Sequence, residues 1–170
     1  GNYNKSEKIY EKIKNKGSVY SWYASKQKAA ILLEIKKSED ALDYLQKEFN
    51  NIKNPKVSEI HEYASFLKNN EKYKEAALHY TKVLDNIDNK HFLYAEASDG
   101  RGVAYERTDR WKKAEIDFLN SLKAKPNQPY VMNYLAYSWI EKGINIEKSL
   151  RMLEKANELK KNDGYIIDSL

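Results

Sequence analysis

The clearest alternation of apolar and polar residues lies in the third quarter of the chain. Trp111, Ala114, Phe118 and Leu122 are spaced three, four and four residues apart, with mainly polar residues between them. This spacing places the four side chains on one face of an amphipathic helix. Pro126 is expected to end that helix, because proline cannot continue it.

A second helix is predicted just before this one, beginning near Leu93. It carries Gly102 and Tyr105, and the polar segment 108–110 separates it from the helix that follows. Asp109 in this segment is expected to cap the following helix, since a carboxylate accepts hydrogen bonds from the first backbone N–H groups. The pattern therefore predicts two helices joined by a tight turn.

Small residues recur at matching places in four similar segments. Ala41, Ala76, Ala114 and Ser149 lie 35, 38 and 35 residues apart. A fixed period of this length within helical segments is typical of stacked helical hairpins. We expect four repeats, at residues 22–55, 57–92, 93–128 and 129–163. The first is degenerate, because Ser25 and Lys28 stand where large apolar residues are usual.

Both ends of the chain match parts of further repeats. Residues 4–15 resemble the second helix of a preceding repeat, since Ser6 falls 35 residues before Ala41. Residues 164–170 match the opening of another first helix. Solenoids normally end in polar capping helices, and neither end has that character. We therefore expect the chain to be a fragment of a longer array.

The third segment resembles a tetratricopeptide repeat. That family has a small residue and an aromatic residue on the first helix, here Gly102 and Tyr105, and then alanine, an aromatic residue and proline, here Ala114, Phe118 and Pro126. Residues 129–135 also resemble stretches of long bacterial tetratricopeptide proteins. The resemblance implies an all-α, right-handed solenoid of helix-turn-helix repeats.

This alignment assigns the core positions by size. Small residues allow close helix packing, and large ones fill the space between helices. Gly100 and Gly102 fit close packing better than a phosphate-binding loop. The small positions are Ala29, Ala64, Gly102 and Ala136 on first helices and Ala41, Ala76, Ala114 and Ser149 on second helices. The large ones are Leu32, Leu67, Tyr105 and Trp139, then Leu45, Tyr80, Phe118 and Leu153.

The positive charge of the chain is concentrated at its beginning. Residues 1–56 contain 12 lysines and 7 acidic residues, whereas residues 57–170 contain 18 basic and 18 acidic residues. Only 4 of the 30 basic residues are arginine, which disfavours nucleic acid, because phosphate forks and base stacking favour arginine. Binding of an anionic polymer by the basic first third is retained as a less favoured alternative.

Residues suited to catalysis or to a metal site are scarce. The chain has no cysteine, and His61, His79 and His91 lack metal-ligand spacing on one helix. The sequence contains no nucleophile elbow and no Walker-type loop. We therefore predict no enzyme activity and no cofactor. No apolar run is long enough to span a membrane. The compartment is left open between the cytoplasm and the bacterial envelope or periplasm.

The resemblance also implies where a partner would bind. In tetratricopeptide proteins the first helices of successive repeats line the concave face, where a partner protein or peptide segment binds. The candidate binding residues at these positions are Tyr23, Lys26, His61, Ser65, Lys68, Asp99, Glu106, Tyr130, Asn133, Tyr137 and Glu141.

The family's clamp for a C-terminal carboxylate is not expected here. It needs lysine and asparagine in one repeat, asparagine in the next, and lysine and arginine in the third. The matching places hold Lys26 and Ala30, then Ser65, then Asp99 and Val103, and Asp99 would repel a carboxylate. The leading hypothesis is a non-catalytic scaffold that binds a segment with a positive or mixed face. The alternative is an architectural array that associates with itself.

Overall fold

The computed structural model describes residues 12, 18–35 and 37–169, and its side-chain description of the first helix begins at Ser21. Within these residues all regular structure is helical and no strand occurs, so the predicted all-α class is confirmed. The predicted helix at 4–15 lies outside the described residues, apart from Lys12. The helices are α2 Ser18–Glu34, α3 Ser38–Asn50, α4 Val57–Asn69, α5 Tyr73–Leu84, α6 Tyr94–Glu106, α7 Trp111–Ala124, α8 Pro129–Glu141, α9 Ile146–Leu159 and α10 Gly164–Ile167.

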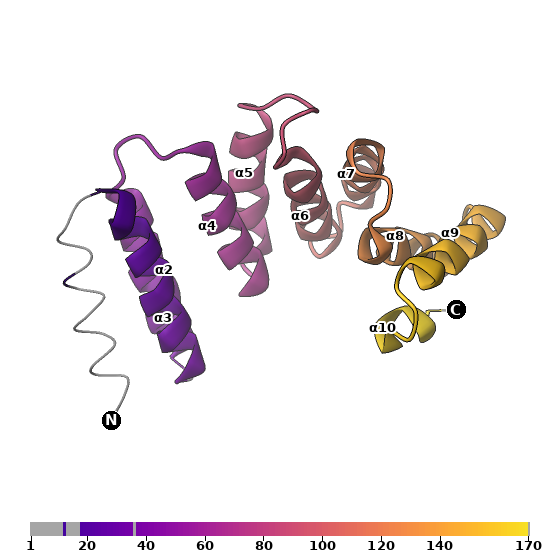
Figure 1. Ribbon diagram of the computed structural model, residues 1–170, viewed down its shortest axis with the longest axis horizontal. Helices are drawn as coiled ribbons and strands as arrows, with labels where there is room; N and C mark the ends of the chain where they lie inside the picture. The colour runs from indigo at the N-terminus through magenta and orange to yellow at the C-terminus, as the bar shows by residue number, and fades with distance from the viewer. Residues whose placement is uncertain (1–11, 13–17, 36, 170) are drawn as a thin grey trace.

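The helices pair into consecutive antiparallel hairpins. α2 packs along α3, α4 along α5, α6 along α7 and α8 along α9, and α10 lies against α8 and α9. Figure 1 shows the hairpins following one another in an arc from α2–α3 to α8–α9. Each helix pair falls within or near one of the four predicted repeats; the division of the chain into these repeats stays a prediction.

Local sequence explains several helix ends. α8 begins with Pro129, whose missing N–H has no partner in the first turn of a helix anyway. After α8, Gly143 adopts a left-handed backbone conformation with φ of +67°. The first turn of α3 contains Glu39 and Asp40, where negative charge favours the helix dipole.

The expected cap at Asp109 is wrong. Arg110 occupies the N-cap position of α7, and no side chain caps that helix end. Asp109 instead has a φ of 58° in the turn. Glu71 and Asn145 hold equivalent left-handed conformations between α4 and α5 and between α8 and α9. Asp109 therefore belongs to the turn that reverses the chain direction between α6 and α7, and it does not cap α7.

The small core positions are buried as the sequence predicts. Ala41, Ala76, Ala114 and Ser149 are 0% exposed, and so are Ala29, Ala64 and Ala136. At Gly102 a Cβ atom would lie only 2.7 Å from the ring of Phe118. Of the eight large positions, six are buried, whereas Leu32 and Tyr105 are only half-buried. Tyr105 lies at the edge of the core, where Arg110 packs over its ring, 4.5 Å from the centroid.

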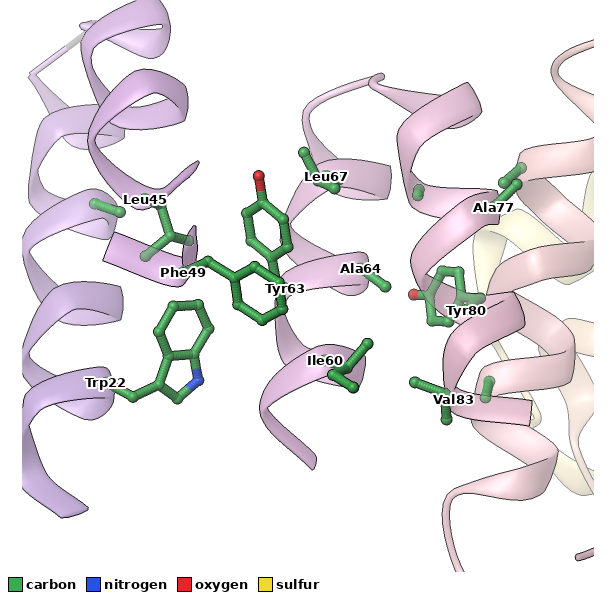
Figure 2. Packing of buried hydrophobic residues seen from close by; sticks show 14 residues of the cluster. Trp22, Leu45, Phe49, Ile60, Tyr63, Ala64, Leu67, Ala77, Tyr80 and Val83 are labelled. Carbon is green, nitrogen blue, oxygen red and sulfur yellow. The ribbon is translucent and has the colours of Figure 1, made fainter. Parts of the chain in front are cut away.

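Aromatic side chains fill the junction between the first two hairpins. The backbones of α3 and α4 approach closely at few points. The rings of Phe49 and Tyr63 stack there with centroids 4.3 Å apart, and Trp22 meets Phe49 edge-on at 5.6 Å. Figure 2 shows these three rings between the α2–α3 hairpin and α4. This junction thus depends on large side chains and not on close backbone packing.

An ion pair connects three helices in the middle of the chain. The guanidinium of Arg101 on α6 donates to both carboxylate oxygens of Asp117 on α7, at 2.7 and 2.8 Å. It also donates to the hydroxyl of Thr81 on α5, at 3.2 Å. Asp117 is only 2% exposed, so the ion pair is a largely buried polar link within the α6–α7 hairpin, and the bond to Thr81 extends it to the preceding hairpin.

Candidate functional site

The eleven candidate residues lie on four helices. We call the side of α2, α4, α6 and α8 that carries them, which is the side expected to be concave, the first-helix face. Tyr23 and Lys26 are on α2, His61, Ser65 and Lys68 on α4, Asp99 and Glu106 on α6, and Tyr130, Asn133, Tyr137 and Glu141 on α8.

The α2 end of this face is tied to α4 by one carboxylate. Glu62 on α4 forms an ion pair with Lys26 at 2.8 Å. Its other oxygen accepts a hydrogen bond from the indole N–H of Trp22 at 2.6 Å. Lys26 is therefore partly neutralised within the fold, whereas Tyr23 beside it is 53% exposed and available for contact.

Three side chains meet at the centre of the face. The hydroxyls of Ser65 on α4 and Tyr80 on α5 are hydrogen-bonded at 2.9 Å. The His61 ring meets the Tyr80 ring edge-on, with centroids 5.7 Å apart. The Nε2 atom of His61 is buried and has no hydrogen-bond partner among the described residues. Burial also lowers the pKa of His61, so the ring is neutral near pH 7.

Asp99 on α6 lies next to this centre. It is half-buried, and burial raises its pKa to about 6, opposed by the charge of Lys68 on α4 and reinforced by Glu96. Neither Asp99 nor Glu96 forms an ion pair within the described part of the chain. The same two charges, of Lys68 and Glu96, also act on His61. The structure thus brings His61, Ser65, Lys68 and Asp99 into one polar group.

Glu106 connects α6 to α8 and is already engaged. Its carboxylate accepts a hydrogen bond from the Tyr134 hydroxyl at 2.7 Å and lies 3.6 Å from the guanidinium of Arg107. Burial and this hydrogen bond raise the pKa of Tyr134. Glu106 is therefore a structural link between two first helices as well as a candidate contact.

The α8 end of the face is shaped by the C-terminal segment. The Tyr130 hydroxyl donates to Asp163 at 2.8 Å and accepts from Lys160, whose ammonium group also lies over the tyrosine ring. Asn133 donates to the hydroxyl of Ser169 at 3.1 Å and is only 1% exposed. Contact between a partner and Asn133 thus requires displacement of the segment 164–169.

The last two candidates remain accessible. Tyr137 is 45% exposed and Glu141 is exposed. Hydrogen bonding to Glu141 raises the pKa of Tyr137. The face therefore has exposed tyrosines near both ends and a half-buried polar group at its centre.

Sequence reasoning missed two residues that organise this face. Glu62 joins Trp22 and Lys26, and Tyr80 reaches the face from a second helix. Glu62 occupies a polar helix position like many others, so the sequence alone does not indicate that it contacts α2. Tyr80 could have been found, because the hydroxyl of a buried tyrosine usually has a hydrogen-bond partner nearby.

Over the described residues, no group of three histidine, aspartate or glutamate side chains is arranged to hold a metal ion. Among the helices described here, none has both the length and the apolar character that crossing a bilayer requires.

Comparison with solved structures identifies the fold. A structure of MamA from MSR-1 matches with a TM-score of 0.70 at 19% identity, over 95% of this chain and 88% of that one. YrrB, a TPR protein with an unusual peptide-binding site, matches with a TM-score of 0.66 at 14% identity, over 89% of this chain and 74% of that one. A chain of the APC/C Cut9–Hcn1 hetero-tetramer matches with a TM-score of 0.70 at 15% identity, over 88% of this chain and 29% of that one.

No protein-family profile and no curated protein matches the sequence. The structural likenesses, all below 25% identity, show the fold. The chain is a tetratricopeptide-type helical-repeat solenoid, as its resemblance to that family predicts.

Proposed function

We propose that this tetratricopeptide-type solenoid is a non-catalytic scaffold whose first-helix face binds an extended or helical segment of a partner protein. The proposal extends over α2, α4, α6 and α8 and has its centre at His61, Ser65 and Asp99. It assigns no reaction to the chain.

One observation carries the proposal. At the centre of the face, His61 has a buried ring nitrogen without a partner, and Asp99 is a half-buried carboxylate without an ion pair within the described residues. Buried polar groups are normally hydrogen-bonded, because leaving one unpaired costs about 1–3 kcal/mol. The buried Nε2 of His61 carries that penalty, and a segment that pairs with it once the ring turns outward would remove the penalty. A cation on the same segment would stabilise the charged form of Asp99, whose pKa is raised by burial. Both gains favour binding here.

The similar proteins support this kind of role. YrrB is described as a peptide-binding TPR protein, and Cut9 occurs in a hetero-tetramer. Stacked hairpins form extended surfaces that suit elongated partners. The exposed Tyr23 and Tyr137 add aromatic contact area, which is enriched at protein interfaces.

Charge at the centre indicates the chemistry of the segment. Asp99 and Glu96 act together on the same region, opposed by Lys68. A free carboxylate would be repelled by the two acids. A lysine or arginine side chain would be attracted by them and could donate hydrogen bonds to Asp99. We therefore expect a segment with a basic residue at its middle.

A peptide selection tests this function. Random peptides displayed on phage would be selected on the 170-residue chain, and the dissociation constants of the enriched sequences measured by fluorescence anisotropy. We expect an enriched basic position and a loss of affinity of about tenfold or more for His61→Ala and Asp99→Asn, because both variants remove groups the segment satisfies.

Matched controls lie on second helices. Leu78→Ala on α5 and Ile116→Ala on α7 remove side chains that are 65% and 58% exposed, and both should leave the affinity of the selected peptides unchanged. If the selected peptides bind the His61 and Asp99 variants as tightly as the unchanged chain, the first-helix face is not the binding surface.

Self-association is a second candidate function, favoured by one observation. Apolar side chains on α9 and α10 are exposed, among them Leu150 at 46%, Tyr165 at 56% and Ile167 at 48%. Where such groups form a contiguous patch, they mark an association surface. Light scattering over a range of concentrations should then show oligomers that Tyr165→Ser together with Ile167→Ser abolishes; a concentration-independent monomer would exclude this role.

A further inference from the structure

The connection between α5 and α6 presents an aromatic side chain to solvent. It spans residues 85–93 and is longer than any other connection between two described helices. Phe92 within it is 77% exposed, whereas its neighbour Leu93 is 7% exposed and anchors the segment to the core. Figure 1 shows this connection as the long loop between α5 and α6.

The backbone around Phe92 is held in place by local hydrogen bonds. The N–H of Lys90 donates to the carboxylate of Asp88 at 2.8 Å, and the N–H of Leu93 donates to Nδ1 of His91 at 3.2 Å. The His91 ring stacks on the Phe92 ring, with centroids 4.6 Å apart. The exposed position of Phe92 is thus part of a hydrogen-bonded loop conformation.

Three lysines lie around a cavity beside this loop. The cavity has a volume of about 530 Å³ and lies between the loop, the start of α6 and the end of α7. Lys90, His91, Lys123 and Lys125 line it, and no carboxylate does. Over the residues that the structure describes, none of the three lysines takes part in an ion pair.

Helix electrostatics explain only part of this arrangement. Lysines near the end of α7 compensate the negative end of its dipole, which accounts for Lys123 and Lys125. The same effect does not account for Lys90 and Phe92, which line the cavity from the loop. Three unneutralised ammonium groups around one cavity produce a positive potential that attracts an acidic ligand.

We propose that this cavity and Phe92 form a second binding site, which takes an acidic protein segment that also carries an apolar side chain. The carboxylates pair with Lys90, Lys123 and Lys125, and the apolar side chain packs on Phe92. A protein segment fits better than a nucleic acid, because the cations are three lysines around one open cavity and not a stripe of arginines that follows a phosphate backbone. None of these residues belongs to the proposed segment-binding group on the first-helix face.

A labelled peptide tests the site. The probe is a short fluorescein-labelled peptide in which one leucine is flanked by aspartates and glutamates. Its affinity for the 170-residue chain would be measured by fluorescence anisotropy at low and at physiological salt. We expect binding that weakens with salt, and a loss of about tenfold or more for the triple change Lys90→Gln, Lys123→Gln and Lys125→Gln, because the charge pairs are removed.

Two variants separate local contact from overall charge. Phe92→Ser should reduce affinity several-fold without changing the melting temperature, since the ring is largely exposed. The control changes three other exposed lysines, Lys74, Lys112 and Lys155, to glutamine. It lowers the net charge by the same amount and should leave affinity nearly unchanged. Replacing the acids of the peptide with glutamine should abolish binding.

Three results would overturn the proposal. The first is no binding of the acidic peptide above that of its glutamine version. The second is an equal loss of affinity in the two triple variants, which would reduce the effect to net charge. The third is tighter binding of a single-stranded oligothymidine than of the peptide through the same three lysines, which would assign the site to nucleic acid.

Discussion

Single positions in the α6–α7 hairpin determine how closely its helices approach. A Cβ atom at Gly102 would meet the Phe118 ring at 2.7 Å, a separation shorter than van der Waals contact. Phe118 is itself 0% exposed, so its ring has little room to move. The absence of a side chain at Gly102 is therefore a packing requirement.

Gly102→Leu is expected to destabilise the chain by about 1–3 kcal/mol through overpacking. Urea denaturation followed by circular dichroism would measure the change. Gly164→Ala is the control, because a Cβ atom there meets nothing within 4 Å, and its effect should be neutral or slightly stabilising. Equal stability of the Gly102 variant and the unchanged chain would contradict the packing geometry.

Asp99 should make stability depend on pH. Burial raises its pKa from 3.8 to about 6, so the folded chain binds this proton more tightly than the unfolded chain does. The contribution of Asp99 to the free energy of unfolding should therefore fall as the pH rises from about 4 to about 6 and stay lower above that range. The charged carboxylate is a destabilising group at neutral pH, which fits a role in binding.

Asp99→Asn should accordingly be more stable than the unchanged chain at pH 7.5, by about 1–3 kcal/mol, given 1.36 kcal/mol per unit of pKa. The advantage should shrink towards zero near pH 3.5, where the carboxyl is protonated in both states. Urea denaturation at the two pH values gives the comparison. A stability difference that is the same at both pH values would disprove the shift.

Between helices, the most consequential contact is the pair of Arg101 and Asp117. Both oxygens of a nearly inaccessible carboxylate are bound by the guanidinium, which also reaches Thr81. Hydrogen bonding and the charge of Asp117 raise the pKa of Arg101 against the effect of burial. The pair therefore fixes the position of α6 between α5 and α7.

Removing one partner of this ion pair should lower the free energy of unfolding more than replacing both partners with apolar residues. Asp117→Ala leaves a partly buried guanidinium without its carboxylate and should cost about 3–5 kcal/mol. The double change Arg101→Met and Asp117→Leu should recover most of that loss, because it leaves no unpaired charge. A double-mutant cycle in urea measures both values; additive losses would show that the two residues do not depend on each other.

The helices and their small core positions could be predicted from the sequence, whereas the polar contacts between helices could not. Amphipathic spacing identified α7, and the period of small residues predicted the buried Ala41, Ala76 and Ala114, because close packing restricts those positions to small side chains. The link between Arg101 and Asp117 was not predicted. Ion pairs across helices depend on how two helices cross, and one helix's periodicity carries no information about that.

The candidate site was predictable to a similar degree. Repeat phase assigned all eleven candidates to the first helices, but it could not show that Asn133 is covered by Ser169 or that Lys26 is paired with Glu62. Both facts depend on tertiary neighbours. The Asp109 cap failed for a local reason, because the tight turn needed a left-handed residue at that place.

The molecule as a whole is not held together uniformly. The α4–α5 hairpin contacts α6 through closely packed backbones, whereas the α2–α3 hairpin contacts α4 mainly through aromatic rings. In a solenoid, stability is approximately a sum over each repeat and its interfaces with the next. Coupling across the α3–α4 junction therefore depends on a few side chains, of which Phe49 lies between Trp22 and Tyr63 (Figure 2).

Phe49→Ala should uncouple the first hairpin from the rest. Removing a buried phenylalanine costs about 3–5 kcal/mol, and the loss should appear as reduced amide hydrogen-exchange protection in α2 and α3, with α6 to α9 unchanged. Phe118→Ala, which removes a fully buried ring from α7, is the matched control and should instead reduce protection around α6 to α8. Because each interface involves only neighbouring hairpins, a uniform loss of protection after Phe49→Ala would show that the described array unfolds as one cooperative unit.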